Sequence, residues 1–187
     1  MTKLVLASAN PHKAEEFTRL LPGHSVEPWD GELPEETGST FLDNARLKAL
    51  HVHAARPGSW VLADDSGIEA AALGGAPGVR SARYAGEHAT DQQNLSALLN
   101  ALAGVDDRRV AYVAQLVAID PGGRELLARG ELRGTLAEAP RGSAGFGYDP
   151  AFVPEGETRT VGEMSAGEKD AISHRARAAA ELLPRLP

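Results

Sequence analysis

A hydrophobic run that leads directly into two adjacent carboxylates, Trp60-Val-Leu-Ala-Asp-Asp-Ser-Gly67, constrains this chain more than any other segment. Its first four residues predict a buried strand. In open α/β proteins ligands bind where strands end, so we expect chemistry at the polar residues that follow. Two neighbouring carboxylates repel each other, and burying them requires a counter-charge. A divalent cation is a common counter-charge, and Mg²⁺ prefers hard oxygen ligands.

The side-chain directions of Asp64 and Asp65 differ if the backbone is extended there. Successive side chains of a strand point to opposite faces, so we expect only one of the two carboxylates to point into a site. The alternative is a surface turn, because Asp, Ser and Gly all favour turns. This segment by itself does not distinguish a strand from a turn. The choice between the two depends on the other segments of the chain.

The composition is that of a globular protein. Its 187 residues are 42% hydrophobic and 24% charged, which fits one domain, or one domain with two lobes, over residues 1–187. The net charge of −7 argues against nucleic acid as a partner. The absence of cysteine excludes disulfides, thiol catalysis and Cys-based zinc sites. No apolar run approaches the length of a membrane span, so we expect a cytoplasmic protein with no membrane partner.

The order of the predicted elements is that of a mixed α/β protein with an antiparallel hairpin at its centre. Pro121-Gly122-Gly123 is a hairpin turn. Asn10-Pro11 and the pattern Thr90-Asp-Gln-Gln93 mark helix starts. Strands are predicted over residues 3–7, 25–28, 60–63, 110–119 and 124–132, with an extended segment over residues 68–71, and helices over residues 11–21, 40–55, 91–102 and 165–183.

The segment Ser8-Ala-Asn-Pro-His-Lys13 lies at a predicted strand-to-helix junction. Free backbone N–H groups and the helix dipole make such a junction an anion site. Ser8 and Asn10 add polar side chains, and Lys13 adds a positive charge. The segment is not a Walker A loop, because the pattern GxxxxGK[ST] is absent. A phosphate site and an ordinary capped helix both fit this pattern.

A second acidic pair, Glu35-Glu36, precedes the predicted helix over residues 40–55. It offers a further metal ligand beside Asp65, or it is an acidic helix start that the helix dipole favours. Asn44 and Lys48 lie one turn apart on the same face of that helix. They either line a pocket or face solvent.

A glycine-rich loop with two aromatic residues, Pro140-Arg-Gly-Ser-Ala-Gly-Phe-Gly-Tyr-Asp-Pro150, is the second strong signal. Glycine lets the backbone approach a ligand closely. Phe146 and Tyr148 suit stacking on a planar base, and Asp149 suits reading its edge. The alternative is a core anchor beneath a long turn.

A cationic cluster follows near the last predicted helix, where Lys169, Ser173, His174 and Arg175 lie close together. Such a group suits phosphate or purine oxygens, because hydrogen bonds from charged donors are the strong ones. A histidine on a helix is more often structural, but its arginine neighbour favours binding.

Taken in order, these segments resemble the inosine/xanthosine triphosphate pyrophosphatase family. The resemblance covers nearly the whole chain, and the ordered set of motifs is specific. One departure is Ser8-Ala9, where many relatives have Thr-Gly, a change that preserves the hydroxyl. The matching motifs are Ser8-x-Asn10-x-x-Lys13, Glu36-Thr37-Gly38-x-Thr40-Phe41-x-x-Asn44-Ala45-x-x-Lys48-Ala49, Asp64-Asp65-Ser66-Gly67, Leu73-Gly74-Gly75-Ala76-Pro77-Gly78-x-x-Ser81-Ala82-Arg83-Tyr84, Gly145-Phe146-Gly147-Tyr148-Asp149-Pro150, Glu168-Lys169 and Ser173-His174-Arg175.

The resemblance implies hydrolysis of non-standard purine nucleoside triphosphates (ITP, dITP, XTP) to the monophosphate and pyrophosphate, which cleanses the nucleotide pool. It also implies Mg²⁺ as cofactor, a cytoplasmic homodimer, and an α/β fold. In that fold a long, mixed, twisted sheet is flanked by helices, and an active-site cleft lies between the two lobes.

The resemblance further implies roles for individual residues. Asp65 corresponds to the catalytic carboxylate that binds Mg²⁺ or activates water, and Glu35 or Glu36 to a further metal ligand. The implied substrate-binding residues are Ser8, Ala9, Asn10, Pro11, His12, Lys13 and Ser66 for the triphosphate, Asn44 beside them, and Phe146, Gly147, Tyr148, Asp149, Lys169, His174 and Arg175 for the base.

Three alternatives compete with this interpretation. An enzyme for modified pyrimidine nucleotides would use the same metal site with another pocket. A non-catalytic nucleotide-binding module would be expected to have lost its carboxylates, which are present here. A structural domain would need the ordered motifs to be coincidental. For a purine, His174 or Arg175 would donate a hydrogen bond to the 6-oxo group of inosine. The same donor would disfavour the 6-amino group of adenine.

Overall fold

The computed structural model describes residues 2–187, which form an open, mixed six-stranded sheet flanked by helices. The strand order is β2-β1-β3-β4-β5-β6. Strand β1 is parallel to both β2 and β3, and β5 is antiparallel to β6. This confirms the predicted fold class. The strands are β1 (Thr2–Leu6), β2 (His24–Pro28), β3 (Trp60–Ala70), β4 (Arg109–Ile119), β5 (Glu125–Leu136) and β6 (Phe152–Pro154).

The helices begin where the capping residues predicted them to begin. Asn10 caps α1, and Thr40 and Thr90 form capping boxes before α2 and α3. The helices are α1 (Pro11–Leu20), α2 (Phe41–Ala55), α3 (Asp91–Ala101), α4 (Ala166–Ile172) and α5 (His174–Leu182), with short 3-10 helices η1 (Ala71–Leu73), η2 (Gly78–Arg83), η3 (Val161–Glu163) and η4 (Leu183–Arg185).

Three boundaries differ from the prediction. The predicted C-terminal helix is two helices, because Ser173 is extended (φ −62°, ψ 156°) and ends α4. Strand β5 continues beyond Leu132, and its last residues pair with β6, which was not predicted. A three-residue strand carries no periodicity from which it can be recognised.

The surface-turn alternative for Asp64 and Asp65 is wrong, because both residues lie inside the eleven-residue strand β3. The expectation that this strand ends at the carboxylates is wrong for the same reason. Gly67 continues the strand where a larger residue does not fit: a Cβ there would collide with Ser81 and with the carbonyl of Gly78. The carboxylates are therefore held by backbone pairing on a rigid element.

The chain divides into two compact units. Unit 1 comprises residues 2–65, 114–130 and 174–187, and unit 2 comprises residues 66–113 and 131–173. The strands β3, β4 and β5 contribute residues to both units. No helix among residues 2–187 is long and apolar enough to span a bilayer.

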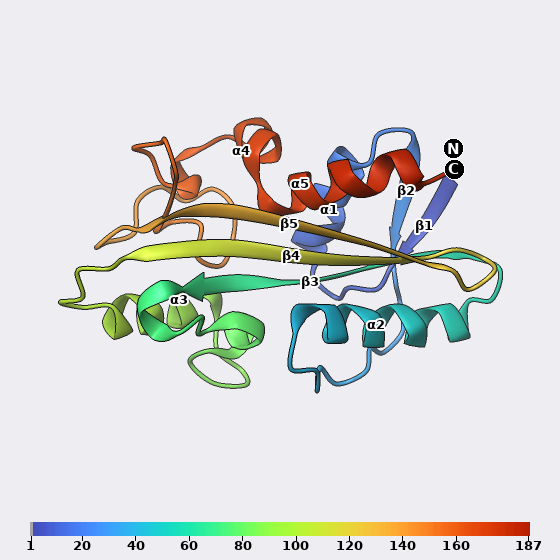
Figure 1. Ribbon diagram of the computed structural model, residues 1–187, viewed down its shortest axis with the longest axis horizontal. Helices are drawn as coiled ribbons and strands as arrows, with labels where there is room; N and C mark the ends of the chain where they lie inside the picture. Colours follow the sequence, from blue (N-terminus) through green and yellow to red (C-terminus); the bar gives the residue numbers. More distant parts are fainter. Residues whose placement is uncertain (1) are drawn as a thin grey trace. The chain divides into compact units, whose positions relative to one another are not determined.

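Unit 1 has two hydrophobic cores, one on each face of its strands. Helices α1 and α5 cover one face and α2 covers the other (Figure 1). Alternation along β1 separates the two cores, since Leu4 and Leu6 belong to the first and Val5 and Ala7 to the second. Unit 2 has one core, in which the apolar side of α3 packs against β3, β4 and β5.

Candidate active site

Strand β3 presents its two carboxylates to opposite faces of unit 1. Leu62 packs in the core of α1 and α5, and Ala63 packs in the core of α2. Because strand side chains alternate, Asp64 shares the face of Leu62 and Asp65 shares the face of Ala63. The two carboxylates therefore have different neighbours, although they are consecutive in the chain.

The α1/α5 face surrounds Asp64 with cations. Its side chain is fully buried, and Oδ2 lies 2.6 Å from Lys13 Nζ and 3.3 Å from Arg175 Nε. The same guanidinium donates through Nη1 to Glu16 Oε2 at 3.0 Å. Glu16 and Arg175 are also buried. Two acidic and two basic side chains from α1, β3 and α5 thus form one buried ion network.

The charge balance of this network favours ionised Asp64. Burial by itself would raise the pKa of Asp64, but Lys13 and Arg175 outweigh burial and hold that pKa well below its usual range. Burial also lowers the pKa of Lys13, and Asp64 offsets part of this effect. The carboxylate is ionised, desolvated and engaged by two cations, which makes it a structural anchor.

The α2 face surrounds Asp65 differently. Lys48 Nζ lies 3.3 Å from Asp65 Oδ1 and 2.6 Å from Glu36 Oε1, and it donates to the carbonyl of Asp64 at 2.9 Å. Asn44 Nδ2 donates to Asp65 Oδ2 at 3.2 Å. One ammonium therefore serves two carboxylates and a carbonyl, so this cluster has one more acidic than basic side chain.

On the α2 face the pKa of Asp65 is raised, whereas on the α1/α5 face the pKa of Asp64 is lowered. Burial raises the pKa of Asp65, and the negative charge of Glu36 adds to this, while Lys48 offsets part of it. For Lys48, burial acts to lower the pKa, but Asp65 and Glu36 outweigh it and the pKa is raised. The ammonium is thus firmly protonated, while the carboxylate of Asp65 is a better base than an ordinary aspartate.

Helix α2 and the preceding loop hold the partners of Asp65 in place. The capping box of Thr40 fixes the start of the helix, so Asn44 and Lys48 lie one turn apart on its buried face. Asn44 Oδ1 also accepts from Gly38 N at 2.7 Å, and a Cβ on Gly38 would collide with Asn44 Oδ1. This contact fastens the loop that carries Glu36.

The alternative that Asn44 and Lys48 face solvent is wrong, because both are buried. Of the acidic pair, Glu36 reaches Lys48, and Glu35 is exposed. Within residues 2–187 there is no group of three or more acidic or histidine side chains placed to hold a metal ion. Any metal site on the α2 face is accordingly built on two carboxylates, those of Glu36 and Asp65.

The segment before α1 has the form of an anion site. Asn10 Oδ1 caps the helix by accepting from His12 N at 2.9 Å, and Pro11 occupies the first turn. Ser8 Oγ accepts from Asn10 N at 3.2 Å, and Ala9 is exposed. The first turn of α1 therefore presents the positive end of the helix dipole, while the N–H groups of Asn10, His12 and Lys13 donate within the segment itself.

Three of the predicted base-pocket residues meet in unit 2. Asp149 Oδ2 lies 2.8 Å from Lys169 Nζ and accepts from Phe146 N at 2.9 Å. The ammonium of Lys169 lies 4.6 Å from the centre of the Phe146 ring, in cation–π geometry. The loop, the carboxylate and the lysine are thus a single cluster.

The other predicted residues of unit 2 lie beside this cluster. Tyr148 is buried and donates to the carbonyl of Ser81 at 2.7 Å, and burial raises its pKa. Gly147 N donates to Asp91 Oδ2 at 2.8 Å, which ties the loop to α3. Ser66 is half-buried at the start of unit 2.

The remaining two base-pocket residues belong to unit 1. His174 is the buried first residue of α5, and Arg175 is the residue that contacts Asp64 and Glu16. The structure thus assigns the predicted base pocket to two groups of residues, one in each unit.

Three buried polar residues were not among the predicted site residues. Lys48 lies one turn from Asn44 on the same helix face, a spacing that fits a pocket and a solvent-facing position equally. Glu16 lies one turn after Lys13, on the face of α1 that carries buried Phe17, and an acidic residue on an apolar helix face signals a buried partner. Tyr112 donates to Asp149 Oδ1 at 3.0 Å, and an isolated tyrosine in a strand gives no such signal.

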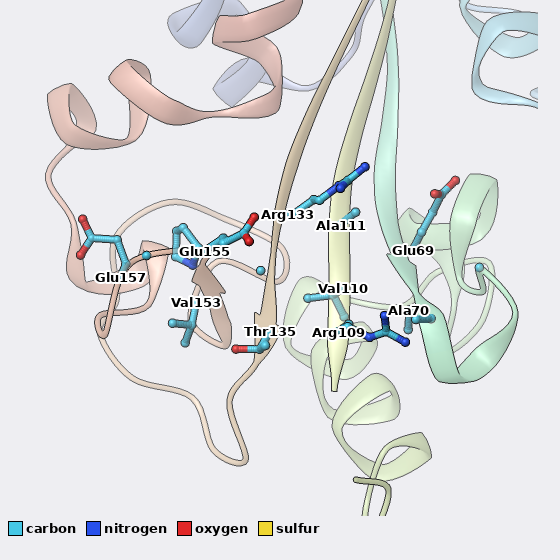
Figure 2. Close-up of a pocket in the computed structure, with 15 residues that line it drawn as sticks. Glu69, Ala70, Arg109, Val110, Ala111, Arg133, Thr135, Val153, Glu155 and Glu157 are labelled. Atoms are coloured by element: carbon cyan, nitrogen blue, oxygen red, sulfur yellow. The ribbon is translucent and has the colours of Figure 1, made fainter. Parts of the chain in front are cut away.

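Unit 2 also contains a cavity of about 670 Å³ that includes none of the predicted residues. Figure 2 shows charged side chains at its rim, from β3, β4, β5 and the segment after β6. Its two arginines are already paired, Arg109 with Asp107 and Arg133 with Glu131, each at 2.7 Å. The cavity is therefore separate from the clusters described above.

Comparison with known proteins agrees with this arrangement of motifs. A dITP/XTP pyrophosphatase of Mycobacterium bovis is 47% identical over 196 residues, which covers 100% of this chain and 96% of that protein. One of Symbiobacterium thermophilum is 50% identical over 191 residues, covering 99% and 95%. The solved structure of a HAM1 protein from Coxiella burnetii superposes with a TM-score of 0.88 at 40% identity, covering 99% of this chain and 98% of that one. The Ham1 family model matches residues 4–185, and the chain belongs to the Ham1 family.

Proposed function

We propose that this protein is a Mg²⁺-dependent pyrophosphatase that hydrolyses ITP, dITP and XTP to the nucleoside monophosphate and pyrophosphate. The observation that carries the proposal is the cluster on the α2 face, where buried Asp65 and partly buried Glu36 both contact Lys48. Relatives that match over nearly their whole length are dITP/XTP pyrophosphatases. The role that follows is removal of deaminated purines from the nucleotide pool.

The residues on the α2 face fit Mg²⁺ by their chemistry. Carboxylate oxygens of Glu36 and Asp65 lie within 2.6 and 3.3 Å of one atom, Lys48 Nζ. These hard oxygen donors lie near each other because both contact the Lys48 ammonium, and Mg²⁺ is commonly held by one or two carboxylates together with water and substrate phosphate. When bound, Mg²⁺ lowers the pKa of water and neutralises charge on the triphosphate.

Asp65 is the group we assign to proton transfer. Hydrolysis requires water to attack a phosphorus atom in line with the leaving pyrophosphate, and the water must lose a proton. The carboxylate of Asp65 takes that proton, because burial raises its pKa. Asn44 holds one oxygen of the carboxylate, so the side chain is oriented before substrate binds.

The triphosphate is assigned to the first turn of α1 and to the lysines beside it. The positive end of the α1 dipole attracts phosphate oxygens. Lys13 and Lys48 supply point charges, and Ser66 supplies a hydroxyl. These groups stabilise the negative charge that moves to the leaving group.

The purine base is assigned to Phe146, Asp149 and Lys169, with His174 and Arg175 as further donors. An aromatic ring provides a stacking surface, and the charged groups read the edge of the base. A 6-oxo group accepts hydrogen bonds where the 6-amino group of adenine donates them, so cationic donors favour hypoxanthine and xanthine.

Family resemblance also supports a cytoplasmic homodimer. Sedimentation of the purified protein tests the dimer, because a dimer has twice the 19.6 kDa mass of the chain.

Pyrophosphate release tests the proposed reaction directly. ITP, dITP, XTP, GTP and ATP are compared with and without Mg²⁺, using the wild-type protein and Asp65→Asn. We expect Mg²⁺-dependent release from the first three substrates, little from GTP or ATP, and loss of release in the variant. Absence of release from every purine triphosphate would reject the assignment. Release that survives Asp65→Asn would move the catalytic centre to another residue.

A further inference from the structure

Asp149 links the loop over residues 140–150 to Tyr112 and Lys169 through hydrogen bonds of its carboxylate. Its side chain is 2% exposed, and it accepts three hydrogen bonds. Two of them, from Lys169 Nζ and Phe146 N, reach Oδ2, and the third, from the Tyr112 hydroxyl, reaches Oδ1. The carboxylate thereby fixes both the backbone of the loop and the ammonium that lies over the Phe146 ring.

Tyr112 is the rigid member of this group. It lies in β4, is buried, and stacks on Phe152 with ring centroids 4.4 Å apart and 21° between the ring planes. The loop residues depend on the loop for their positions, whereas Tyr112 is held by strand pairing and by its aromatic neighbour. Its hydroxyl is thus a fixed donor to which the loop is fastened.

The space around the carboxylate leaves it a single orientation. Gly145 has φ 76°, and a Cβ at this position would collide with Asp149 Oδ2. Asp149 N lies 3.3 Å from the carbonyl of Phe146, and the carbonyl of Asp149 accepts from Gly162 N at 2.8 Å. Lys169 Nζ and Phe146 N donate to Oδ2, and the Tyr112 hydroxyl donates to Oδ1, so Tyr112 supplies the hydrogen bond that holds the second oxygen.

We propose that Tyr112 is a positioning residue that, through Asp149, holds Lys169 and the Phe146 amide in the arrangement that receives the purine base. The inference rests on the proposed function for its kinetic consequence. Its structural consequence, order in the loop of the free protein, is independent of any activity. Tyr112 itself touches no reacting atom.

The kinetic test is Tyr112→Phe, which removes one oxygen and keeps the ring stacked on Phe152. Loss of a hydrogen bond to a charged group weakens an interaction by roughly tenfold or more. We expect KM for dITP to rise about tenfold and kcat to stay within about twofold, because the triphosphate groups are unchanged. The preference for dITP over dATP should fall with it, because these bases differ in the 6-oxo group that the cationic donors recognise. Tyr84→Phe is the matched control, since it removes the same atom from a half-buried tyrosine packed against the same core, and it should leave KM unchanged.

A double-variant cycle separates positioning from general loosening of unit 2. If Tyr112 acts through Asp149, adding Tyr112→Phe to Asp149→Asn should raise KM by much less than it does in the wild-type background. Effects that multiply in full would overturn the proposal, and so would an unchanged KM in Tyr112→Phe.

Amide hydrogen exchange of the nucleotide-free protein tests the same contact without activity. The Phe146 amide, which donates to Asp149, should exchange faster in Tyr112→Phe and not in Tyr84→Phe. Unchanged exchange would overturn the proposal. Faster exchange in a protein whose wild type cleaves no purine triphosphate would support the hydrogen-bond chain and reject the proposed function instead.

Discussion

The two faces of β3 in unit 1 carry the same side chain one residue apart and surround it differently. On the α1/α5 face, one oxygen of Asp64 contacts two cations, and a second buried acid, Glu16, completes the network. On the α2 face, Asp65 and Glu36 share one lysine. The cations around Asp64 hold it ionised, whereas Asp65, whose pKa is raised, is the better acceptor of a proton. This difference is the basis of our proposal that Asp64 is structural and Asp65 is catalytic.

Replacement of Asp65 should have the largest effect, and the effect should be on activity alone. Asp65→Asn keeps the shape and the contact with Asn44 but removes the base and a metal ligand. We expect pyrophosphate release from dITP to fall by about a thousandfold. The melting temperature should stay unchanged or rise, because burial disfavours the charge that is removed. A clear fall in melting temperature would place Asp65 among the structural residues.

Replacement of Asp64 should have the opposite signature. Asp64→Asn removes the carboxylate that Lys13 contacts and leaves buried Arg175 with Glu16 as its acidic partner. Breaking a buried ion pair costs about 3–5 kcal/mol. Urea unfolding measures this change in the free energy of unfolding. If Asp64→Asn unfolds as the wild type does but is inactive, the roles of the two carboxylates are reversed.

Glu16→Gln should give a smaller loss of stability on the same face. The guanidinium of Arg175 retains Asp64 but loses a charged acceptor, which costs about 1–2 kcal/mol. Glu15→Gln is the matched control, because Glu15 is the exposed neighbour on the same helix and should change stability by less than about 0.5 kcal/mol. Equal effects of the two variants would show that the buried network is not stabilising.

The pH dependence of stability should distinguish the two faces in metal-free protein. The pKa of Asp64 is lowered, so its stabilisation is complete above the unfolded value of about 3.9 and is lost only as pH falls below that value. The pKa of Asp65 is raised, so ionised Asp65 costs stability above that pKa, and the cost disappears as pH falls through it.

Melting curves in EDTA from pH 8 to pH 3 measure this difference. The advantage of Asp65→Asn over the wild type should be largest at pH 8 and should shrink toward pH 4. The deficit of Asp64→Asn should stay constant over that range and shrink only below about pH 4. Parallel curves for both variants would mean that the two faces do not differ in charge balance.

The sequence predicted the parts of this molecule that local rules determine. Alternation in β3 separates Asp64 from Asp65, and capping residues place α1, α2 and α3. It did not predict that β3 continues past the carboxylates, because Asp, Ser and Gly also favour turns. The partners of the carboxylates come from distant segments: Lys48 reaches Asp65 across 17 residues and Arg175 reaches Asp64 across 111. Such contacts follow from tertiary packing and leave no periodic signal.

Metal binding by the purified protein tests the division between the two faces most directly. Mn²⁺ replaces Mg²⁺ at oxygen sites, and its electron paramagnetic resonance signal measures the free ion in titrations of the wild type, Glu36→Gln, Asp65→Asn and Asp64→Asn. The account predicts that Glu36→Gln and Asp65→Asn lose Mn²⁺ binding, while folded Asp64→Asn retains it. Binding that is lost in Asp64→Asn and retained in Asp65→Asn would contradict the account and place the metal on the α1/α5 face.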